Sequence, residues 1–255
     1  MKKYWEIFTD KFGGTILHPQ FIMLSYRANA LEKIKKYASG KKVIDIGCGR
    51  MPYRKILEPT TLKYIGLDDQ KVSKLYNSKV KPEILADITK RTQIKNNSFD
   101  VAFMLEVLEY LENPQKAFDE IARILDKKGI LVFTAPFLYP LHDVPYDRNR
   151  YTSTQIKTFL TTSKFKILKL EAKGGFLSFW FQSINVFLFK RIMDILKSKK
   201  NFMSYLYLAF LLFITPEVVL LTNSIFLLTK NFSFLSYPNY FPLDYLVVAV
   251  KESKN

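Results

Sequence analysis

A short apolar stretch that ends in a carboxylate and a glycine turn carries the clearest chemical signal in this chain. Residues 43–46 read Val-Ile-Asp-Ile, and Gly47, Cys48 and Gly49 follow directly. The short apolar run predicts a buried strand, and glycine lets the backbone adopt positive φ and approach a ligand closely. Because ligands of open α/β sheets bind at the carboxyl ends of strands, this turn marks a ligand site. Asp45 suits a cationic sulfonium or ammonium group better than a pyrophosphate.

Acidic residues also end the next two predicted strands. Asp68 and Asp69 follow the apolar run 64–67, and Asp87 follows the run 84–86. A carboxylate about 20 residues after a glycine turn can accept hydrogen bonds from ribose hydroxyls. A dinucleotide fingerprint fits less well, because Pro52 stands where Gly-x-Gly-x-x-Gly needs its third glycine. The pattern therefore favours a ligand that contains a nucleoside but is not a dinucleotide.

The spacing Asp-x-Gly-x-Gly, with the later acids in this order, resembles the class I S-adenosylmethionine-dependent methyltransferases. Residues 97–110 resemble the fourth strand of that family and the segment after it, and residues 125–132 resemble its turn into strand five. The resemblance covers roughly residues 40–172 and implies S-adenosylmethionine as cofactor. It places Asp87 at the adenine amino group and the Ile88 backbone beside the ring. The implied cofactor-binding residues are Asp45, Gly47, Cys48, Gly49, Asp68, Asp69, Asp87, Ile88, Leu105 and Glu106.

Two residues depart from the family pattern. Met51 stands where a third glycine of the turn is often found, and Tyr110 stands where many relatives carry histidine. Neither change removes a group that binds the cofactor. Both leave open a non-catalytic domain that binds the cofactor without transferring its methyl group.

Alternating strand and helix patterns place these residues in a layered fold. Strands are expected at 43–46, 64–67, 84–86, 101–105, 130–135 and 245–250, and helices at 19–38 and 114–126. Asn113 and Pro114 suit the start of the second helix. The alternation predicts an α/β fold with a doubly wound sheet. The resemblance implies a Rossmann-like, seven-stranded sheet with the last strand antiparallel, and we expect a hydrophobic helical insertion before that strand. The expected divisions are an N-terminal helical segment 1–40, a cofactor-binding core 41–172, the insertion 173–240 and the final strand 241–255.

The loop after the fifth strand carries the candidate catalytic group. It runs from 136 to 152 and holds His142, which we expect to act as a general base because histidine titrates near neutral pH. The alternative is that His142 and Asp143 only stabilise the loop. Tyr146, Asp147 and Arg150 are expected to order the loop or to touch the acceptor. His18 is the other histidine, so no Cys/His cluster has metal-ligand spacing, and Cys48 is expected to be a small buried residue.

The region 176–229 is apolar and aromatic, with a basic stretch at 190–200 and with Pro216-Glu217 in its second half. The first apolar run is shorter than the roughly 20 residues that a membrane-spanning helix needs. A single crossing by the second run would separate the last strand from its sheet. Crossing by both runs would place the basic stretch on the far side, against the positive-inside rule. We therefore expect interfacial or re-entrant amphipathic helices on an anionic membrane surface. The alternative is a helical lid or a dimer face.

Composition narrows the functional classes. The chain has 255 residues, a net charge of +16 and a single cysteine, so it forms no intrachain disulfide. No apolar run follows the N-terminus, and both features favour the cytoplasm. The charge favours an anionic membrane or a nucleic acid. We expect a methyltransferase on the inner membrane face, acting on a small, lipid-like or lipid-linked glycan acceptor. The alternatives are a non-catalytic membrane-tethering protein and, less favoured, an RNA methyltransferase; the oligomeric state is not predicted.

Overall fold

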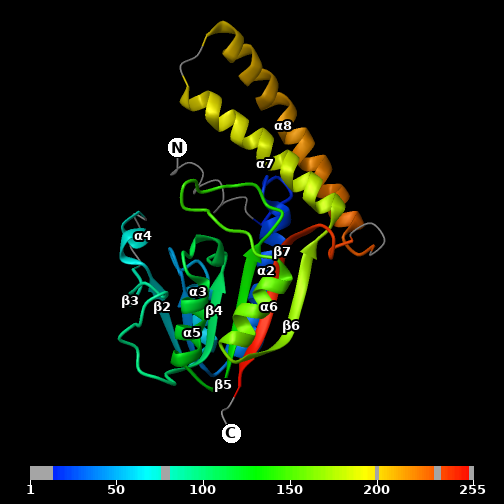
Figure 1. The fold of residues 1–255 in the computed structure, drawn as a ribbon. Coiled ribbons are helices and arrows are strands. Elements are labelled where there is room, and N and C mark those ends of the chain that lie inside the picture. Colours follow the sequence, from blue (N-terminus) through cyan, green and yellow to red (C-terminus); the bar gives the residue numbers. More distant parts are fainter. Residues whose placement is uncertain (1–13, 76–80, 199–200, 233–236, 253–255) are drawn as a thin grey trace. The chain divides into compact units, whose positions relative to one another are not determined.

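The computed structural model describes residues 14–75, 81–198, 201–232 and 237–252. Within these residues the strands form one seven-stranded sheet in the order β3-β2-β1-β4-β5-β7-β6 (Figure 1). The strands are β1 Lys42–Ile46, β2 Lys63–Asp68, β3 Ile84–Leu85, β4 Phe99–Leu105, β5 Leu125–Pro136, β6 Phe165–Gly174 and β7 Pro242–Lys251.

The pairing of the strands confirms the predicted topology. β1 pairs in parallel with β2 on one side and with β4 on the other, and β5 is parallel to β4. β7 is antiparallel to β5, with Asp244 opposite Pro136. The strand order reverses between β1 and β4, which is the point where open α/β sheets bind their ligands. The glycine turn after β1 lies at this point.

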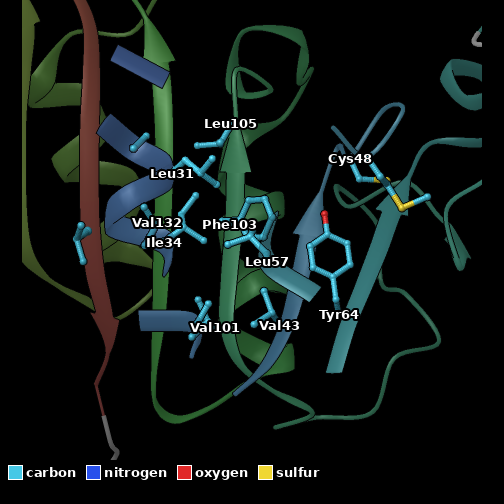
Figure 2. Close-up of a cluster of buried hydrophobic side chains, with 14 of the residues drawn as sticks. Leu31, Ile34, Val43, Cys48, Leu57, Tyr64, Val101, Phe103, Leu105 and Val132 are labelled. Atoms are coloured by element: carbon cyan, nitrogen blue, oxygen red, sulfur yellow. The ribbon is translucent and has the colours of Figure 1, made fainter. Parts of the chain in front are cut away.

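Helices cover both faces of the sheet. On one face lie α2 (Phe21–Ala38) and α3 (Arg54–Leu57); Figure 2 shows Leu31 and Ile34 of α2 beside Phe103 and Val132 of the strands. On the other face lie α5 (Pro114–Ile124) and α6 (Ser153–Thr162). There the ring of Phe118 lies 5.4 Å from that of Phe133. Successive residues of β5 point to opposite faces of the sheet, so Val132 packs on the side of α2 and Phe133 on the side of α5. Short helices complete the core: η1 Glu58–Thr60, α4 Gln70–Leu75 and η2 Leu108–Tyr110.

Helix α5 begins as expected and ends two residues early. The Asn113 side chain accepts a hydrogen bond from the Lys116 backbone N–H at 3.2 Å, with Pro114 in the first turn. The expected end at residue 126 is wrong, because Leu125 already pairs with Phe99 as the first residue of β5. The fifth strand therefore starts at 125 and not at 130. An apolar residue at the junction satisfies both the helix stripe and the strand pattern, so periodicity alone does not locate the boundary.

The chain falls into two compact units. One comprises Arg27–Phe137, Leu141–Glu171 and the chain from Asp244 onward; the other comprises the chain up to Tyr26, Leu138–Pro140 and Ala172–Leu243. The boundary at Tyr26 lies inside α2. The four divisions expected from the sequence follow sequence regions rather than compactness, and they stay a prediction.

The second unit contains a helical hairpin of α7 (Phe176–Lys197) and α8 (Phe202–Thr229). Asn185 of α7 bonds to Asn223 of α8, while Ile192 and Ile195 pack with Leu208 and Leu211, so the helices are antiparallel. Helix α8 continues through Pro216. A proline removes one backbone donor, and the packing of α8 on α7 outweighs that loss. In the described part of the chain, α8 alone is long and apolar enough to cross a membrane by length and composition.

Candidate functional site

The glycine turn is held by hydrogen bonds from its backbone to the end of β2. Gly47 and Gly49 have φ of 68° and 54°, the left-handed region that favours glycine. The N–H groups of Gly47 and Cys48 donate to the Leu67 carbonyl at 2.8 and 3.1 Å. The N–H of Gly49 donates to Asp68 Oδ2 at 2.8 Å, and the other oxygen of Asp68 accepts from Asp69 N–H. Asp68 therefore fixes the turn and keeps one further lone pair on each oxygen.

Gly47 is also required by the space around it. A Cβ at this position would lie 2.4 Å from Cγ2 of Val107, in the segment after β4. No real Cβ contact is that short, so any other residue would push Val107 or the turn out of place. The backbone of the turn therefore packs directly against the end of the neighbouring strand.

Met51 occupies space that another glycine leaves open. Its φ is 53°, an uncommon value for a residue with a side chain, and only 4% of its surface is exposed. A Cβ on Gly66 in β2 would lie 2.7 Å from Met51 Sδ and 2.9 Å from Cys48 Sγ. Met51 stands where the family often has glycine, and its side chain fits because Gly66 has no side chain in that space. Burial and the nearby carboxylates raise the pKa of the Cys48 thiol, which fits its expected role as a small buried residue.

Asp45 is a buried carboxyl group at the end of β1. The Tyr64 hydroxyl donates to it, and the Arg54 guanidinium lies 5.1 Å from the centre of the Tyr64 ring. Burial raises the pKa of Asp45 to about 8; the Tyr64 hydrogen bond opposes this rise and the charge of Asp68 adds to it. A cation beside Asp45 would stabilise its charged form. Nothing in the strand pattern singled out Tyr64, which the sequence interpretation missed.

Asp69 and Asp87 have local roles in the chain. Asp69 accepts from the N–H groups of Lys71 and Val72 at the start of α4. Asp87 accepts from the backbone and the hydroxyl of Thr89, at 2.9 and 2.6 Å. Burial acts to raise the pKa of Asp87, but its hydrogen bonds from Thr89 and Lys90 hold it below its usual value. Ile88 is buried beside it. Asp87 therefore stays ionised at neutral pH, and the contacts of both acids with a cofactor stay predictions.

Carboxyl groups gather around the end of β5. The Thr134 hydroxyl donates to Glu106 Oε1 at 2.6 Å, and the Ala135 N–H donates to Asp244 Oδ1 at 3.0 Å. Glu109 is buried, and within the described residues neither oxygen of its side chain has a hydrogen-bond partner. Burial raises the pKa of Glu109 and of Asp244, and the charge of Glu106 adds to both shifts. No sequence pattern singled out Glu109 or Asp244, since each acid looks like an ordinary surface residue.

The loop after β5 contains both His142 and the acid that orients it, Asp147. His142 Nδ1 lies 2.9 Å from Asp147 Oδ2, and the His142 backbone N–H donates to the same oxygen at 3.0 Å. Arg150 pairs with both oxygens of Asp147, so the acid is fixed on two sides. On its far side, His142 Nε2 lies 2.8 Å from the Tyr110 hydroxyl and 4.0 Å from Glu109 Oε1. Asp147 and Arg150 order the loop, one of the two roles expected for them.

The structure joins the predicted cofactor residues into a chain of contacts along two strand ends. Asp68 accepts from the backbone of the turn 47–49 and acts electrostatically on Asp45, while Leu105 ends the neighbouring strand and Glu106 follows it. A glycine turn with carboxylates on both sides offers acceptors for an amino group and for ribose hydroxyls. This donor and acceptor set fits S-adenosylmethionine. The individual cofactor assignments, and His142 as catalytic residue, stay predictions.

Comparison with known sequences agrees with this geometry. Residues 44–133 match the sequence model of a family described as a methyltransferase domain. An uncharacterized protein of Methanocaldococcus jannaschii, MJ1252, is 33% identical over 107 residues. That match covers 42% of this chain and 41% of the relative, so the chain spans about two fifths of the length of that protein.

Solved structures share the fold. A SAM-dependent methyltransferase from Archaeoglobus fulgidus has a TM-score of 0.56 at 17% identity, covering 97% of this chain and 100% of that one. The [4+2]-cyclase SpnF has a TM-score of 0.57 at 15% identity, covering 91% of this chain and 82% of that one. The name of the second relative shows that this fold by itself does not fix the reaction. Residues 44–133 thus match a methyltransferase domain, and the sheet and the glycine turn of the chain have the fold of the S-adenosylmethionine-dependent methyltransferases, whose cofactor is S-adenosylmethionine.

Proposed function

We propose that this protein transfers a methyl group to a hydroxyl of a small, lipid-like or lipid-linked glycan acceptor at the membrane surface. The observation that carries the proposal is the fixed imidazole of His142, with Asp147 against one ring nitrogen and a hydroxyl against the other. Bound S-adenosylmethionine supplies an electrophilic methyl group, which an acceptor oxygen attacks in line with the departing sulfur.

His142 serves as the general base in this proposal. In this proposal the neutral imidazole carries its proton on Nδ1, which lies 2.9 Å from Asp147 Oδ2, and Nε2 is the acceptor. Nε2 takes the hydroxyl proton as the new carbon–oxygen bond forms and the carbon–sulfur bond breaks. The products are a methyl ether, S-adenosylhomocysteine and a protonated imidazole, which Asp147 stabilises. The Tyr110 hydroxyl, at hydrogen-bond distance from Nε2, occupies the position that such an acceptor hydroxyl would take.

The membrane part of the proposal is supported by the hairpin of α7 and α8 and by the net charge of +16. Large apolar side chains of α8 are exposed, among them Phe202, Phe210 and Phe213. Exposed apolar surface of this extent marks an interaction site. We therefore propose a peripheral protein on the cytoplasmic face of the membrane, where a lipid-like acceptor is at hand.

The test compares methyl transfer by the wild type with that of His142→Ala, using S-adenosylmethionine labelled in its methyl group and a membrane-lipid and lipid-linked glycan extract. We expect kcat to fall about 10²–10⁴-fold, the usual contribution of a general base, with the affinity for S-adenosylmethionine unchanged. Asp143→Asn, an exposed acid next to His142, is the matched control and should keep full activity. Unchanged kcat in His142→Ala would overturn the catalytic assignment.

The same assay separates the alternatives. Cofactor binding without transfer to any lipid or glycan fraction would favour the non-catalytic tethering protein. Methyl transfer to RNA, with an affinity that falls steeply as salt rises, would favour the RNA methyltransferase. The side chain of Met51 packs over Gly66, which weakens the argument that this departure marks an inactive site.

A further inference from the structure

Charged and apolar residues are divided between the two helices of the hairpin. From 201 to 216 the sequence of α8 carries no charged residue, and its exposed side chains there are Phe202, Met203, Tyr205, Leu206, Tyr207, Phe210, Leu212 and Phe213. The corresponding part of α7 carries Lys190, Arg191, Asp194 and Lys197. The outer side of α8 between residues 202 and 213 is therefore an uncharged aromatic surface. The charged residues of the same part of the hairpin lie on α7.

The interior of the hairpin is polar at its base and apolar toward its tip. Near the base, Asn223 Nδ2 donates to the carbonyls of Ile16 and His18, and Gln182 Nε2 donates to that of Pro19. These buried amides fix the basal half to residues 16–19. Toward the tip, the buried contacts between the helices are those of Ile192, Ile195, Leu208 and Leu211. The distal half is thus the part that is apolar inside and, along α8, outside.

A hairpin with this division does not suit a crossing of the bilayer. α7 follows β6 and α8 leads into β7, and these strands are neighbours in the sheet (Figure 1). If α8 crossed, α7 would have to cross beside it and carry its four charged residues through the hydrocarbon toward the far side. Each charge at the bilayer centre costs about 2.5–3.5 kcal/mol. With the helix axes parallel to the membrane, those charges stay at the headgroups.

We propose that the hairpin lies edge-on in the surface of an anionic bilayer, with the 202–213 face of α8 in the acyl boundary and α7 at the headgroups. The inference rests on the proposed membrane association and assigns the surface and its orientation. The basic residues of α7 supply the charge that anionic headgroups attract. The Arg191 guanidinium of α7 lies 5.7 Å from the centre of the Tyr207 ring of α8. Both side chains have an apolar body and a polar end, so in this orientation they lie at the boundary between headgroups and acyl chains.

The experiment measures the depth of single labels in vesicles of phosphatidylglycerol and phosphatidylcholine. Phe202→Cys and Phe213→Cys, at positions that are 74% and 77% exposed, lie 11 residues apart on one face of α8. Lys197→Cys reports on α7, and the unsubstituted chain, whose single cysteine is the buried Cys48, measures background labelling. Each protein is labelled with nitrobenzoxadiazole and quenched by lipids that carry a nitroxide at known depths.

We expect labels at 202 and 213 to be quenched at the same shallow acyl depth, and the label at 197 to remain accessible to water. A crossing would separate the depths of 202 and 213 by about 16 Å, the length of 11 helical residues, and would overturn the orientation. Flotation with the vesicles while all three labels stay in water would refute the assigned surface alone. Failure to float would refute the membrane part of the proposed function. In that case sedimentation equilibrium would test whether the same face binds a second copy, and cofactor binding by calorimetry would be unaffected.

Discussion

The glycine turn and the helical hairpin are stabilised in opposite ways. In the turn, consecutive backbone N–H groups are paired with the Leu67 carbonyl and with Asp68, and a single added carbon at Gly47 would collide with Val107. In the hairpin, buried amides hold the base, and large apolar side chains of α8 face outward. The first region fixes atoms to within a fraction of an ångström, as a cofactor requires. The second offers broad apolar area that tolerates small displacements, as a fluid partner requires.

Buried polar groups also serve different ends in the two regions. Around the turn and the end of β5 they are carboxyl groups, and burial raises the pKa of Asp45, Glu109 and Asp244. In the hairpin they are neutral amides and hydroxyls, paired with one another and with carbonyls. Carboxyl groups whose pKa is raised by burial can respond to a cation or a proton, whereas amides only specify how two helices pack. The contrast separates the reactive part of the molecule from its structural part.

The largest effect is expected from Gly47→Ala. The new Cβ would meet Val107 at 2.4 Å and would sit on a residue with positive φ, so the free energy of unfolding should fall by about 3–5 kcal/mol. Chemical denaturation measures the loss. Val107→Ala in the same chain should recover part of the steric cost and none of the cost of positive φ. An unchanged midpoint in Gly47→Ala would mean that the turn is as adaptable as the hairpin.

The second prediction concerns Asp68→Ala. It removes the acceptor for the Gly49 and Asp69 N–H groups and the carboxylate assigned to the ribose, so affinity for S-adenosylmethionine should fall at least about 100-fold, or about 2.7 kcal/mol. Calorimetric titration measures this loss. Asp100→Ala, at the start of β4, serves as an acidic control that should bind normally. Binding retained by Asp68→Ala would remove the turn from the cofactor site.

The two regions also differ in how far the sequence could describe them. Strand ends, glycines and acids of the turn follow the spacing of a known family, so the doubly wound sheet, the antiparallel last strand and the cofactor could be predicted from that resemblance. Tyr64 beside Asp45, and Asp244 beside Glu109, come from residues distant in sequence that only the pairing of strands brings together. Their positions depend on register, which no local pattern encodes.

In the hairpin, the sequence predicted helices and an apolar surface, and it left open how Pro216 affects the second helix. A proline normally ends a helix because it lacks a donor and crowds the preceding turn. Here the helix continues because Leu211, Thr215 and Val219 are buried on its inner side, and their packing favours a continuous helix. The buried amides were likewise invisible as a set, since Gln182, Asn185 and Asn223 are spread over two helices. Helix propensity therefore describes the segment as a whole, while tertiary packing decides whether a proline interrupts the helix.

The third prediction is that Asn223→Ala loosens the hairpin and leaves the cofactor site unchanged. Its amide donates to two carbonyls and accepts from Asn185, and unpaired buried groups would remain after the change. The free energy of unfolding should fall by about 2 kcal/mol, the cost of leaving a buried partner unsatisfied. Leu228→Ala, at an exposed position of α8, should change it by less than about 0.5 kcal/mol. A loss of cofactor affinity in Asn223→Ala would show that the two regions are coupled.

The smallest effect is a pH dependence of cofactor affinity that depends on Asp45. Its pKa of about 8 leaves the carboxyl group largely protonated at pH 7, whereas a bound cation favours the ionised form. Affinity for S-adenosylmethionine should therefore rise by up to about tenfold from pH 7 to pH 9, with release of less than one proton per site. Calorimetry in two buffers of different ionisation enthalpy measures that proton. Asp45→Asn should remove this part of the dependence and leave only the part that belongs to the ligand.

The raised pKa of Asp45 has the opposite effect on stability. The folded chain keeps a proton that the unfolded chain loses above its usual pKa, so the free energy of unfolding should fall as pH rises from about 4 to about 8. A wild type whose affinity and stability both follow those of Asp45→Asn would show that the buried carboxyl group is as inert as the amides of the hairpin.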